Sequence, residues 1–142
     1  MADPVRAFVD SNVFVYAFDA DEPQKRKQAA ALLADLRNDG RVVVSTQVLL
    51  EFHWVTTRKL SKPLSREVAR RETARIAELT VVPADSALVL DAVARSTSSG
   101  ITIWDAMIVE AALRSGCATL FSEDLQDGWE IDGRLRVVNP FA

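Results

Sequence analysis

Residues 5–18 read VRAFVDSNVFVYAF, and this stretch decides the fold class. The apolar run from Val5 to Val9 ends at Asp10, a pattern typical of a strand buried on both faces of a parallel sheet. Ser11 can cap a short helix that begins at once and reaches Phe18. The stretch therefore predicts a strand followed directly by a helix. Its acidic residue stands at the carboxyl end of the strand, where open α/β sheets bind their ligands.

The rest of the chain repeats this alternation of strand and helix. Short apolar runs predict further strands at residues 41–45, 81–82, 118–122 and 135–138. Apolar stripes and capping residues predict helices at 23–38, 46–60, 65–79, 85–96 and 102–116, with the TSSG of residues 97–100 as a loop. This order predicts an α/β fold of three layers, with a mainly parallel central sheet of about five strands flanked by helices. Within residues 123–134, Asp132-Gly133 is either a tight hairpin turn or a bend.

Length and composition indicate an ordinary globular protein. The 142 residues suit a single domain spanning residues 1–142, and 49% hydrophobic with 26% charged residues is typical of soluble domains. Cys117 is the only cysteine, so we expect no disulfide within the chain and interpret its side chain as buried. No apolar run has the length of a membrane span, and Asp3 and Pro4 interrupt the start where a signal peptide needs a basic and then an apolar segment. We therefore expect a cytoplasmic protein.

Four acidic residues occupy positions that need an explanation. Asp10 directly follows the first strand and Asp124 follows the strand at 118–122, so both lie at one sheet edge if these strands are neighbours. Glu51 and Asp105 each lie on a helix among apolar neighbours, where an acid without a partner is rare. Taken singly, each of three acids has a simpler explanation. Asp10 can be a helix cap, Asp105 can be an acid in the first helical turn that the helix dipole stabilises, and Asp124 can be a solvated surface acid.

Converging carboxylates need compensation. Two of them about 4 Å apart repel by roughly 4 kcal/mol at an effective dielectric constant of about 20, so they must take up protons, pair with Lys or Arg, or bind a cation. An all-oxygen set favours Mg²⁺ or Mn²⁺, which can activate a water for attack on a phosphoryl group. One histidine and one cysteine exclude the familiar zinc sites. The chain also has no GxxxxGK(S/T), GxGxxG or GxSxG motif.

Four blocks of sequence carry a family resemblance. They are VDSNVFVYAFD at 9–19, STQVLLEF at 45–52, WDAMIVEAA at 104–112 and LFSEDLQDGWEIDGRLRVVNPF at 120–141. In this order, over essentially the whole chain, they resemble PIN-domain proteins, and more narrowly the VapC-type toxins of bacterial toxin–antitoxin pairs. A lone DSN or SED would be a weak signal, whereas the ordered set of four is specific.

The resemblance implies a single PIN domain that acts as a metal-dependent endoribonuclease. The family's acidic quartet corresponds to Asp10, Glu51, Asp105 and Asp124, which are expected to be catalytic and to bind the metal. The expected cofactor is Mg²⁺ or Mn²⁺. The resemblance also implies tRNA or ribosomal RNA as the substrate, a homodimer, and a small antitoxin whose C-terminal segment covers the acidic pocket.

Three further polar residues are expected around this quartet. Asn12 and Ser122 correspond to family positions that flank the quartet and orient carboxylates or water. Asp127 is an additional nearby acid, which either contributes through a water or only adds negative potential.

Outside the acids, basic and aromatic residues bear on RNA contact. The net charge of −3 argues against a nonspecific polyanion binder, although basic side chains gather in residues 58–75. An RNA backbone contact and a solvated helix face explain that segment equally well. Trp54 and Trp104 can stack on a base, but core packing is the favoured explanation; Trp129 is interpreted as partly exposed. His53 is interpreted as a surface or packing residue, not a general base.

Two other classes of function remain open. A metal-dependent phosphatase or phosphotransferase also places an Asp after its first strand, but usually needs a second Asp two residues later, where this chain has Asn12. A noncatalytic binding module that keeps the acids to dock a basic partner tail is the other alternative. Cleavage of RNA that depends on both a divalent metal and Asp10 distinguishes the nuclease from both.

Overall fold

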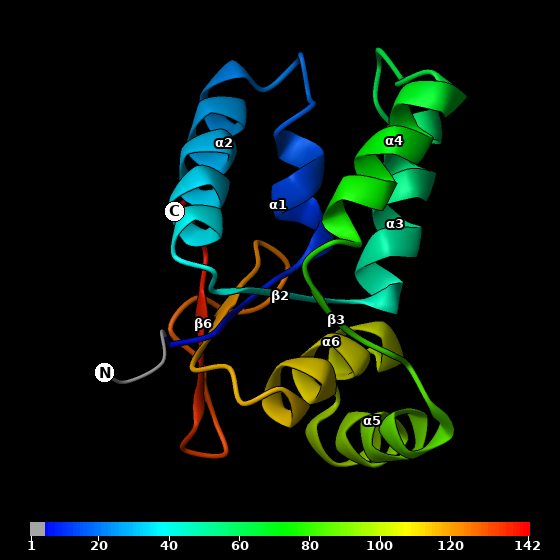
Figure 1. The fold of residues 1–142 in the computed structure, drawn as a ribbon. Coiled ribbons are helices and arrows are strands. Elements are labelled where there is room, and N and C mark those ends of the chain that lie inside the picture. Colours follow the sequence, from blue (N-terminus) through cyan, green and yellow to red (C-terminus); the bar gives the residue numbers. More distant parts are fainter. Residues whose placement is uncertain (1–4) are drawn as a thin grey trace.

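The structure, a computed structural model, describes residues 5–142 (Figure 1). In chain order its elements are β1 (Ala7–Val9), α1 (Ser11–Tyr16), α2 (Pro23–Asn38), β2 (Val42–Ser45), α3 (Thr46–Arg58), α4 (Arg66–Ile76), β3 (Thr80–Val82), α5 (Ser86–Ser99), α6 (Ile103–Arg114), β4 (Thr119–Phe121), β5 (Glu130–Ile131) and β6 (Leu135–Val138). The expectation that rests on Asp3 and Pro4 lies outside the described residues. Within residues 5–142, no helix is both long and apolar enough to cross a membrane.

The six strands form one sheet in the order β3-β2-β1-β4-β6-β5. All neighbouring pairs are parallel except β5 with β6. β1 lies between β2 and β4, and Val9 is paired with Phe121 in register, so the ends of β1 and β4 lie side by side. The expected α/β fold with a mainly parallel sheet is confirmed, with six strands where about five were expected.

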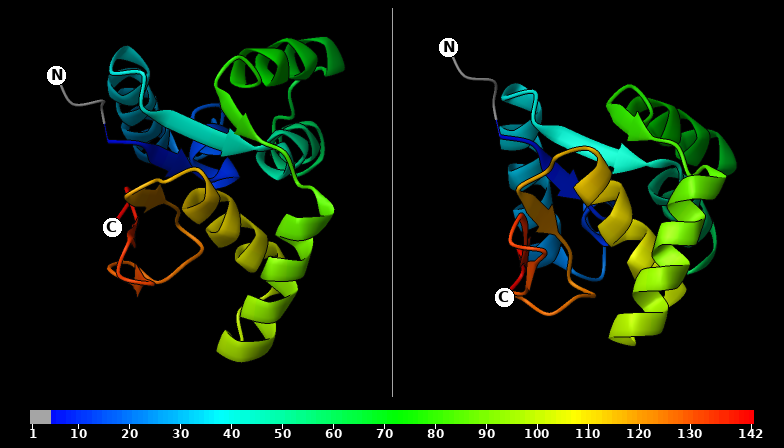
Figure 2. Two further views of the ribbon diagram at one scale, coloured as in Figure 1. Left: turned by 60° about the horizontal axis from the view of Figure 1, so that its bottom comes forward. Right: turned by 90° about the horizontal axis from the view of Figure 1, so that it is seen from below.

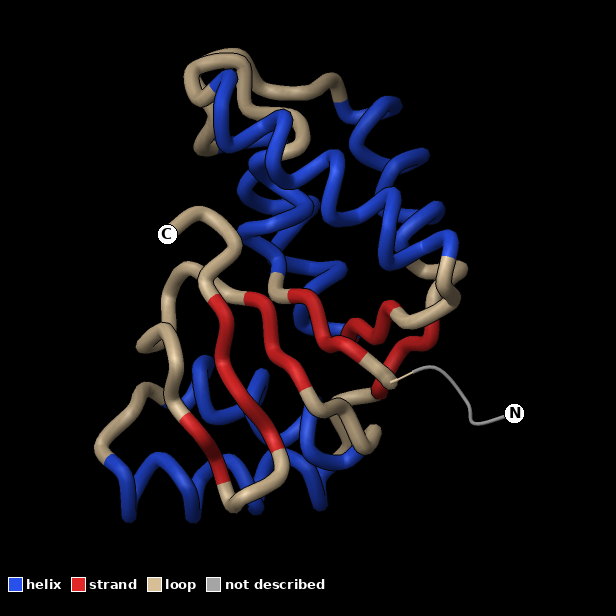
Figure 3. Tube along the Cα trace, turned by 90° about the vertical axis from the view of Figure 1, so that its left-hand side faces the viewer, coloured by secondary structure: helices blue, strands red, loops and turns tan. Residues whose placement is uncertain are grey.

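Helices cover both faces of this sheet, which confirms the three layers. Helices α1 to α4 lie on one face and α5 with α6 on the other, as Figure 3 shows from the side. Figure 2 shows α5 and α6 packed side by side across their face. The strands β1 and β2 are buried throughout, as the apolar run around Phe8 predicts for a sheet covered on both sides. Cys117 is buried as expected.

One segment differs from the secondary structure expected from the sequence, and another decides between two expected turns. The expected loop at residues 97–100 is wrong, because α5 continues to Ser99 and ends only at Gly100, whose φ of 78° closes the last turn. The hydroxyls of Thr97 and Ser99 donate to carbonyls one turn earlier, so these polar side chains are satisfied within the helix. Asp132-Gly133 forms a hairpin turn with φ values of 54° and 64°, and this turn adds the antiparallel β5 to the sheet.

Candidate metal centre

Asp10 is a buried acid at the junction of β1 and α1. Its side chain is 4% exposed, and one carboxylate oxygen caps α1 by accepting the Ser11 N–H at 2.7 Å. The other oxygen accepts a hydrogen bond from Ser122 Oγ at 2.8 Å. Burial raises the pKa of Asp10 to about 7; these two hydrogen bonds oppose the rise, whereas the charges of Glu51 and Asp124 add to it. Asp10 is thus both a helix cap and a carboxylate whose ionised form is disfavoured by burial.

Asp124 reaches the same place from the end of β4. Its backbone N–H donates to Ser122 Oγ at 3.1 Å, and Asn12 Nδ2 donates to Asp124 Oδ2 at 3.2 Å and to Ser122 Oγ at 3.4 Å. Ser122, fully buried, therefore donates to Asp10 while it accepts from Asp124 and Asn12. The structure brings Asn12 and Ser122 together with two of the acids, and the pairing of β1 with β4 is the reason.

Glu51 and Asp105 reach the site from two helices. Glu51 is half-buried on α3, and burial raises its pKa, as do the charges of Asp124 and Asp105. Asp105 lies in the first turn of α6, where Thr102 caps its backbone N–H at 3.1 Å. Burial also raises the pKa of Asp105, and the charge of Asp124 contributes. The charge of Asp124 therefore acts on each of the other three acids.

Among the described residues, one carboxylate oxygen of Glu51 has no hydrogen-bond donor. Its Oε1 is buried without a hydrogen-bond partner. The Gln47 amide lies one turn earlier on α3, but its Nε2 donates to the Trp104 carbonyl at 3.2 Å, and its own oxygen is likewise buried and unpartnered. Buried acceptors are normally satisfied, so an unpartnered oxygen of this kind is a candidate to contact a water or a cation.

Within the described part of the chain, no basic side chain neutralises this group of acids. Among the ion pairs of residues 5–142, none includes Asp10, Glu51, Asp105 or Asp124. A hard divalent cation matches such a set of oxygen donors. In the same range, no three His, Cys, Asp or Glu side chains are already arranged tightly enough to hold an ion. The donor set therefore fits a divalent cation by its chemistry.

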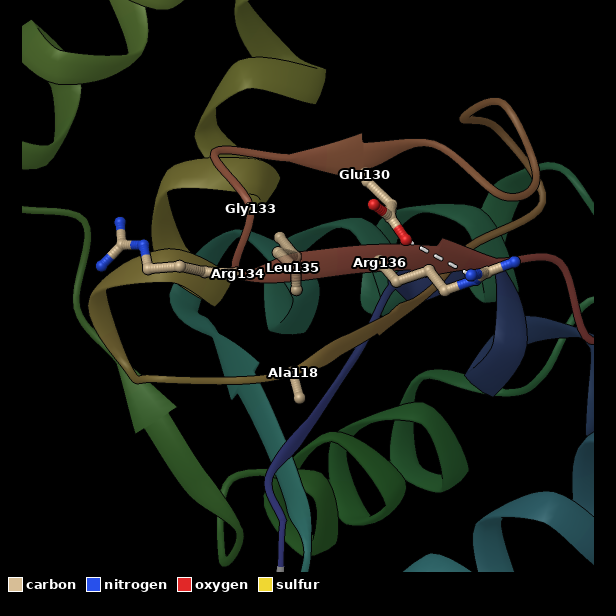
Figure 4. A pocket seen from close by; sticks show the side chains of 6 residues that line it. All are labelled: Ala118, Glu130, Gly133, Arg134, Leu135 and Arg136. Carbon is tan, nitrogen blue, oxygen red and sulfur yellow. Dashed lines mark hydrogen bonds and ion pairs between the residues drawn. The ribbon is translucent and has the colours of Figure 1, made fainter.

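A surface groove opens onto this edge of the sheet. Asp105 and Asp124 line it together with the segment from Ser99 to Thr102 and with Trp129, which is partly buried as expected. Another hollow lies elsewhere: Figure 4 shows it beside the β5–β6 hairpin, where Glu130 pairs with Arg136 at 3.4 Å. It contains none of the four acids, whereas the groove reaches two of them, Asp105 and Asp124.

Asp127 is held differently from the quartet. Its carboxylate accepts the backbone N–H of Asn139 at 2.8 Å, just after β6. This contact stabilises the chain reversal that follows Asp124. The structure thus places Asp127 on the neighbouring loop, engaged with the backbone and not with the four acids.

Glu123 has a role at this site that the sequence did not predict. This residue lies between Ser122 and Asp124, and its carboxylate accepts from the Tyr16 hydroxyl at 2.6 Å and from Lys25 Nζ at 2.7 Å. Burial alone would raise the pKa of Glu123, but the hydrogen bonds from Lys25 and Tyr16 hold it below its usual value. Its backbone N–H donates to Asn12 Oδ1 at 3.3 Å. Glu123 therefore anchors the turn that carries Asp124 to α1 and α2.

Two tryptophans expected in the core are on the surface. Trp54 is 52% exposed and Trp104 is 67% exposed, so the favoured explanation of core packing is wrong for both. The buried stripe of α3 is Val48, Phe52 and Thr56, at a spacing of four residues, and Trp54 falls outside it. His53 is exposed, in agreement with its interpretation as a surface residue.

Comparison with known proteins identifies the class. A model of the PIN domain matches residues 7–126, so this chain belongs to the PIN domain family. Its fold is that of VapC toxins. A toxin–antitoxin complex from Klebsiella pneumoniae is similar with a TM-score of 0.70 and 17% identity, covering 94% of this chain and 97% of that one. Mycobacterium tuberculosis VapC20, described as a sarcin-ricin loop cleaving toxin, is similar with a TM-score of 0.65 and 18% identity, covering 83% and 89%.

A third similar structure is VapBC2 from Rickettsia felis bound to a DNA fragment of its promoter. Its TM-score is 0.63 at 17% identity, and the match covers 95% of this chain and 100% of that one. Identities this low indicate a shared fold. No curated protein sequence matches the chain.

Proposed function

We propose that this protein is a metal-dependent endoribonuclease, the toxin of a toxin–antitoxin pair, and that it hydrolyses RNA phosphodiester bonds with Mg²⁺ or Mn²⁺. One observation carries the proposal: four acids from β1, α3, α6 and the end of β4 interact electrostatically without a cationic partner in the described chain. Membership of the PIN domain family supports it, as does the likeness to VapC20, a sarcin-ricin loop cleaving toxin.

The side chains have distinct parts in this proposal. A bound divalent cation would supply an activated water and stabilise the charge that develops on the phosphate. Asp10 offers a carboxylate whose orientation is set by Ser11 and Ser122. Asn12 orients Asp124 by donating to its Oδ2. These hydrogen bonds fix the ligands before the metal arrives, and contacts of this kind typically change metal affinity or activity about 10- to 100-fold.

Glu51 and Asp105 complete the centre from the helices. Glu51 Oε1, which lacks a partner, is available to accept a hydrogen bond from a water. Asp105 lines the groove together with Asp124, so a substrate phosphate would enter beside these two acids. The N-terminal turn of α6 favours a negative group at this position.

We also propose the partners that the family resemblance implies: a small antitoxin, a homodimer, and tRNA or ribosomal RNA as the substrate, in the cytoplasm. The antitoxin is supported by the complexes from Klebsiella pneumoniae and Rickettsia felis, whose toxins share this fold over most of the chain. A phosphatase or phosphotransferase is less well supported, because Asn12 stands where a second Asp would be needed and is occupied with Asp124.

A metal-titrated cleavage assay on mixed RNA tests the proposal. The wild-type protein should degrade RNA with Mg²⁺ or Mn²⁺, and EDTA should abolish the activity. Asp10→Asn should remove it while circular dichroism shows the fold intact, and Asp35→Asn, on the exposed side of α2, serves as the matched control. Full cleavage by Asp10→Asn would sink the mechanism, and activity on small phosphate esters alone would favour the phosphatase.

A further inference from the structure

One stripe of α3 leads from the acidic centre to an exposed aromatic and basic surface. Glu51, Trp54 and Arg58 are spaced three and seven residues apart, so they lie along one side of the helix. The rise from Glu51 to Arg58 is roughly 10 Å at the geometry of an α-helix. In Figure 1, α3 begins beside the sheet and runs away from it next to α4. The stripe thus connects the centre with the far end of α3.

A groove lies at that far end, between α3 and the start of α4. Its lining side chains are His53, Trp54, Thr57, Arg58, Leu64 and Arg66. The backbone N–H of Leu64 donates to the Thr56 carbonyl at 2.9 Å, which holds the connection between the two helices against α3. The groove is therefore built on two helices and a tethered connection.

Trp54 presents an aromatic face in this groove together with a cation. It is 52% exposed, and the Arg58 guanidinium lies over its ring at 4.4 Å from the centroid. A tryptophan ring half in water is available to an unpaired base, and an adjacent arginine both stacks and contacts phosphate.

The positive charge of the side chains that line the groove favours an anionic ligand. No acidic residue is among its lining side chains. Further along α4, Arg70 pairs with Glu67 at 2.6 Å and Arg75 with Glu72 at 3.3 Å. Arg58 and Arg66, in contrast, have no carboxylate within ion-pair distance among the described residues. Part of the basic segment is thus a solvated face of ion pairs, whereas the charges of its two groove arginines are not neutralised by an ion pair within residues 5–142.

We propose that this groove binds unpaired RNA next to the scissile bond, with a base stacked on Trp54 and phosphates on Arg58 and Arg66. The inference rests on the proposed function, since it supplies the substrate contacts of the same centre. An RNA strand fits better than a protein segment because the groove combines an exposed ring with two unneutralised cations. Stacking requires a base that is free of its own partner, so single-stranded or looped RNA is bound in preference to a duplex.

The test is direct binding in EDTA, which prevents cleavage. Anisotropy of a dye-labelled, mixed-sequence single-stranded oligoribonucleotide is measured for the wild type, Trp54→Leu and Trp54→Phe. Trp54→Leu should weaken binding about 5- to 150-fold, the range for loss of one stacked base, and Trp54→Phe should retain most of the affinity. Leu90→Ala is the control, because Leu90 is also an exposed apolar side chain but lies on α5.

The arginines are tested by salt dependence. Arg58→Gln with Arg66→Gln should reduce the slope of log affinity against log salt by about 1.4, the value for two single-strand phosphate contacts. Arg26→Gln, an exposed change on α2, should leave the slope as it is.

The outcomes distinguish a failure of the proposed RNA-binding groove from a failure of the proposed nuclease reaction. If Trp54→Leu and Leu90→Ala bind the oligoribonucleotide with equal affinity, the proposed role of the groove is refuted even if the wild type cleaves RNA. Trp54-dependent binding without any metal-dependent cleavage supports the groove and refutes the proposed reaction. If Trp54→Leu changes the oligomeric state in size-exclusion chromatography but not RNA affinity, the surface is a protein interface and the inference fails.

Discussion

The burial of Asp10 predicts an unusual dependence of stability on pH when no metal is present. Its pKa is about 7 in the folded protein and 3.8 for an ordinary Asp. Because the folded value is the higher one, the unfolded chain releases this proton first. The contribution of Asp10 to the free energy of unfolding is therefore fully present below about pH 4 and is lost as the pH rises toward 7. At 1.36 kcal/mol per pH unit, the loss amounts to about 4 kcal/mol, a large part of the roughly 5–15 kcal/mol that stabilises a typical domain.

Asp10→Asn should abolish most of this loss. Asn keeps an oxygen that can cap α1 through the Ser11 N–H, whereas its amide NH2 replaces the oxygen that accepted from Ser122 Oγ. In EDTA at pH 8, the variant should therefore be more stable than the wild type by roughly 1–4 kcal/mol, the lower bound allowing for weaker hydrogen bonds.

The assay is urea unfolding in EDTA between about pH 5.5 and pH 8. Over this interval the acids whose pKa is lowered, such as Asp85 and Asp132, are ionised in both states and contribute no slope. The wild-type midpoint should fall as the pH rises, and that of Asp10→Asn should fall less. Excess Mg²⁺ at pH 8 should raise the wild-type midpoint and leave that of the variant nearly unchanged. The reasoning is refuted if the wild type gains stability over this interval, or if Asp10→Asn is the less stable protein at pH 8.

Three further predictions concern the turn of Ser122 and the end of α5. Ser122→Ala removes the donor to Asp10 and the acceptor of Asp124, so Mn²⁺ affinity measured by calorimetry should fall about 10- to 100-fold; an unchanged affinity would show that the metal does not depend on this hydroxyl. Glu123→Gln loses its ion pair with Lys25, so cleavage should need about 10-fold more Mg²⁺ while kcat at saturation changes less; a loss confined to kcat would contradict a positioning role. Gly100→Ala forces a side chain to φ 78° and should cost about 1 kcal/mol in thermal unfolding, with Ser98→Ala as the control; equal melting temperatures would refute the strain.

Much of the site could be inferred from local pattern. Asp10 ends an apolar run, which predicts its place at a strand end, although the cap of α1 is Asp10 itself and not Ser11 as the sequence suggested. Glu51 and Asp105 were conspicuous because each is an acid among apolar neighbours at helical spacing. These signals are local, since they depend on residues within about one helical turn of the acid.

Other features depend on residues far apart in the chain. No spacing rule connects Glu123 with Tyr16 and Lys25, and their contact exists only because α1 and α2 pack over the end of β4. The surface position of Trp54 was missed for a related reason. Aromatic residues are usually assigned to the core, and only the packing of α3 shows which of its sides is buried.

The amino-acid sequence by itself thus determined the α/β alternation, the family and the four acids, because strand length, helical period and capping are set by neighbouring residues. Only the tertiary structure decided that β1 and β4 are adjacent, which brings Asp10, Ser122 and Asp124 into one hydrogen-bonded group. It also decided that Asp10 is buried deeply enough for its pKa to reach about 7. Desolvation and charge repulsion act through space, so they depend on packing and not on position along the chain.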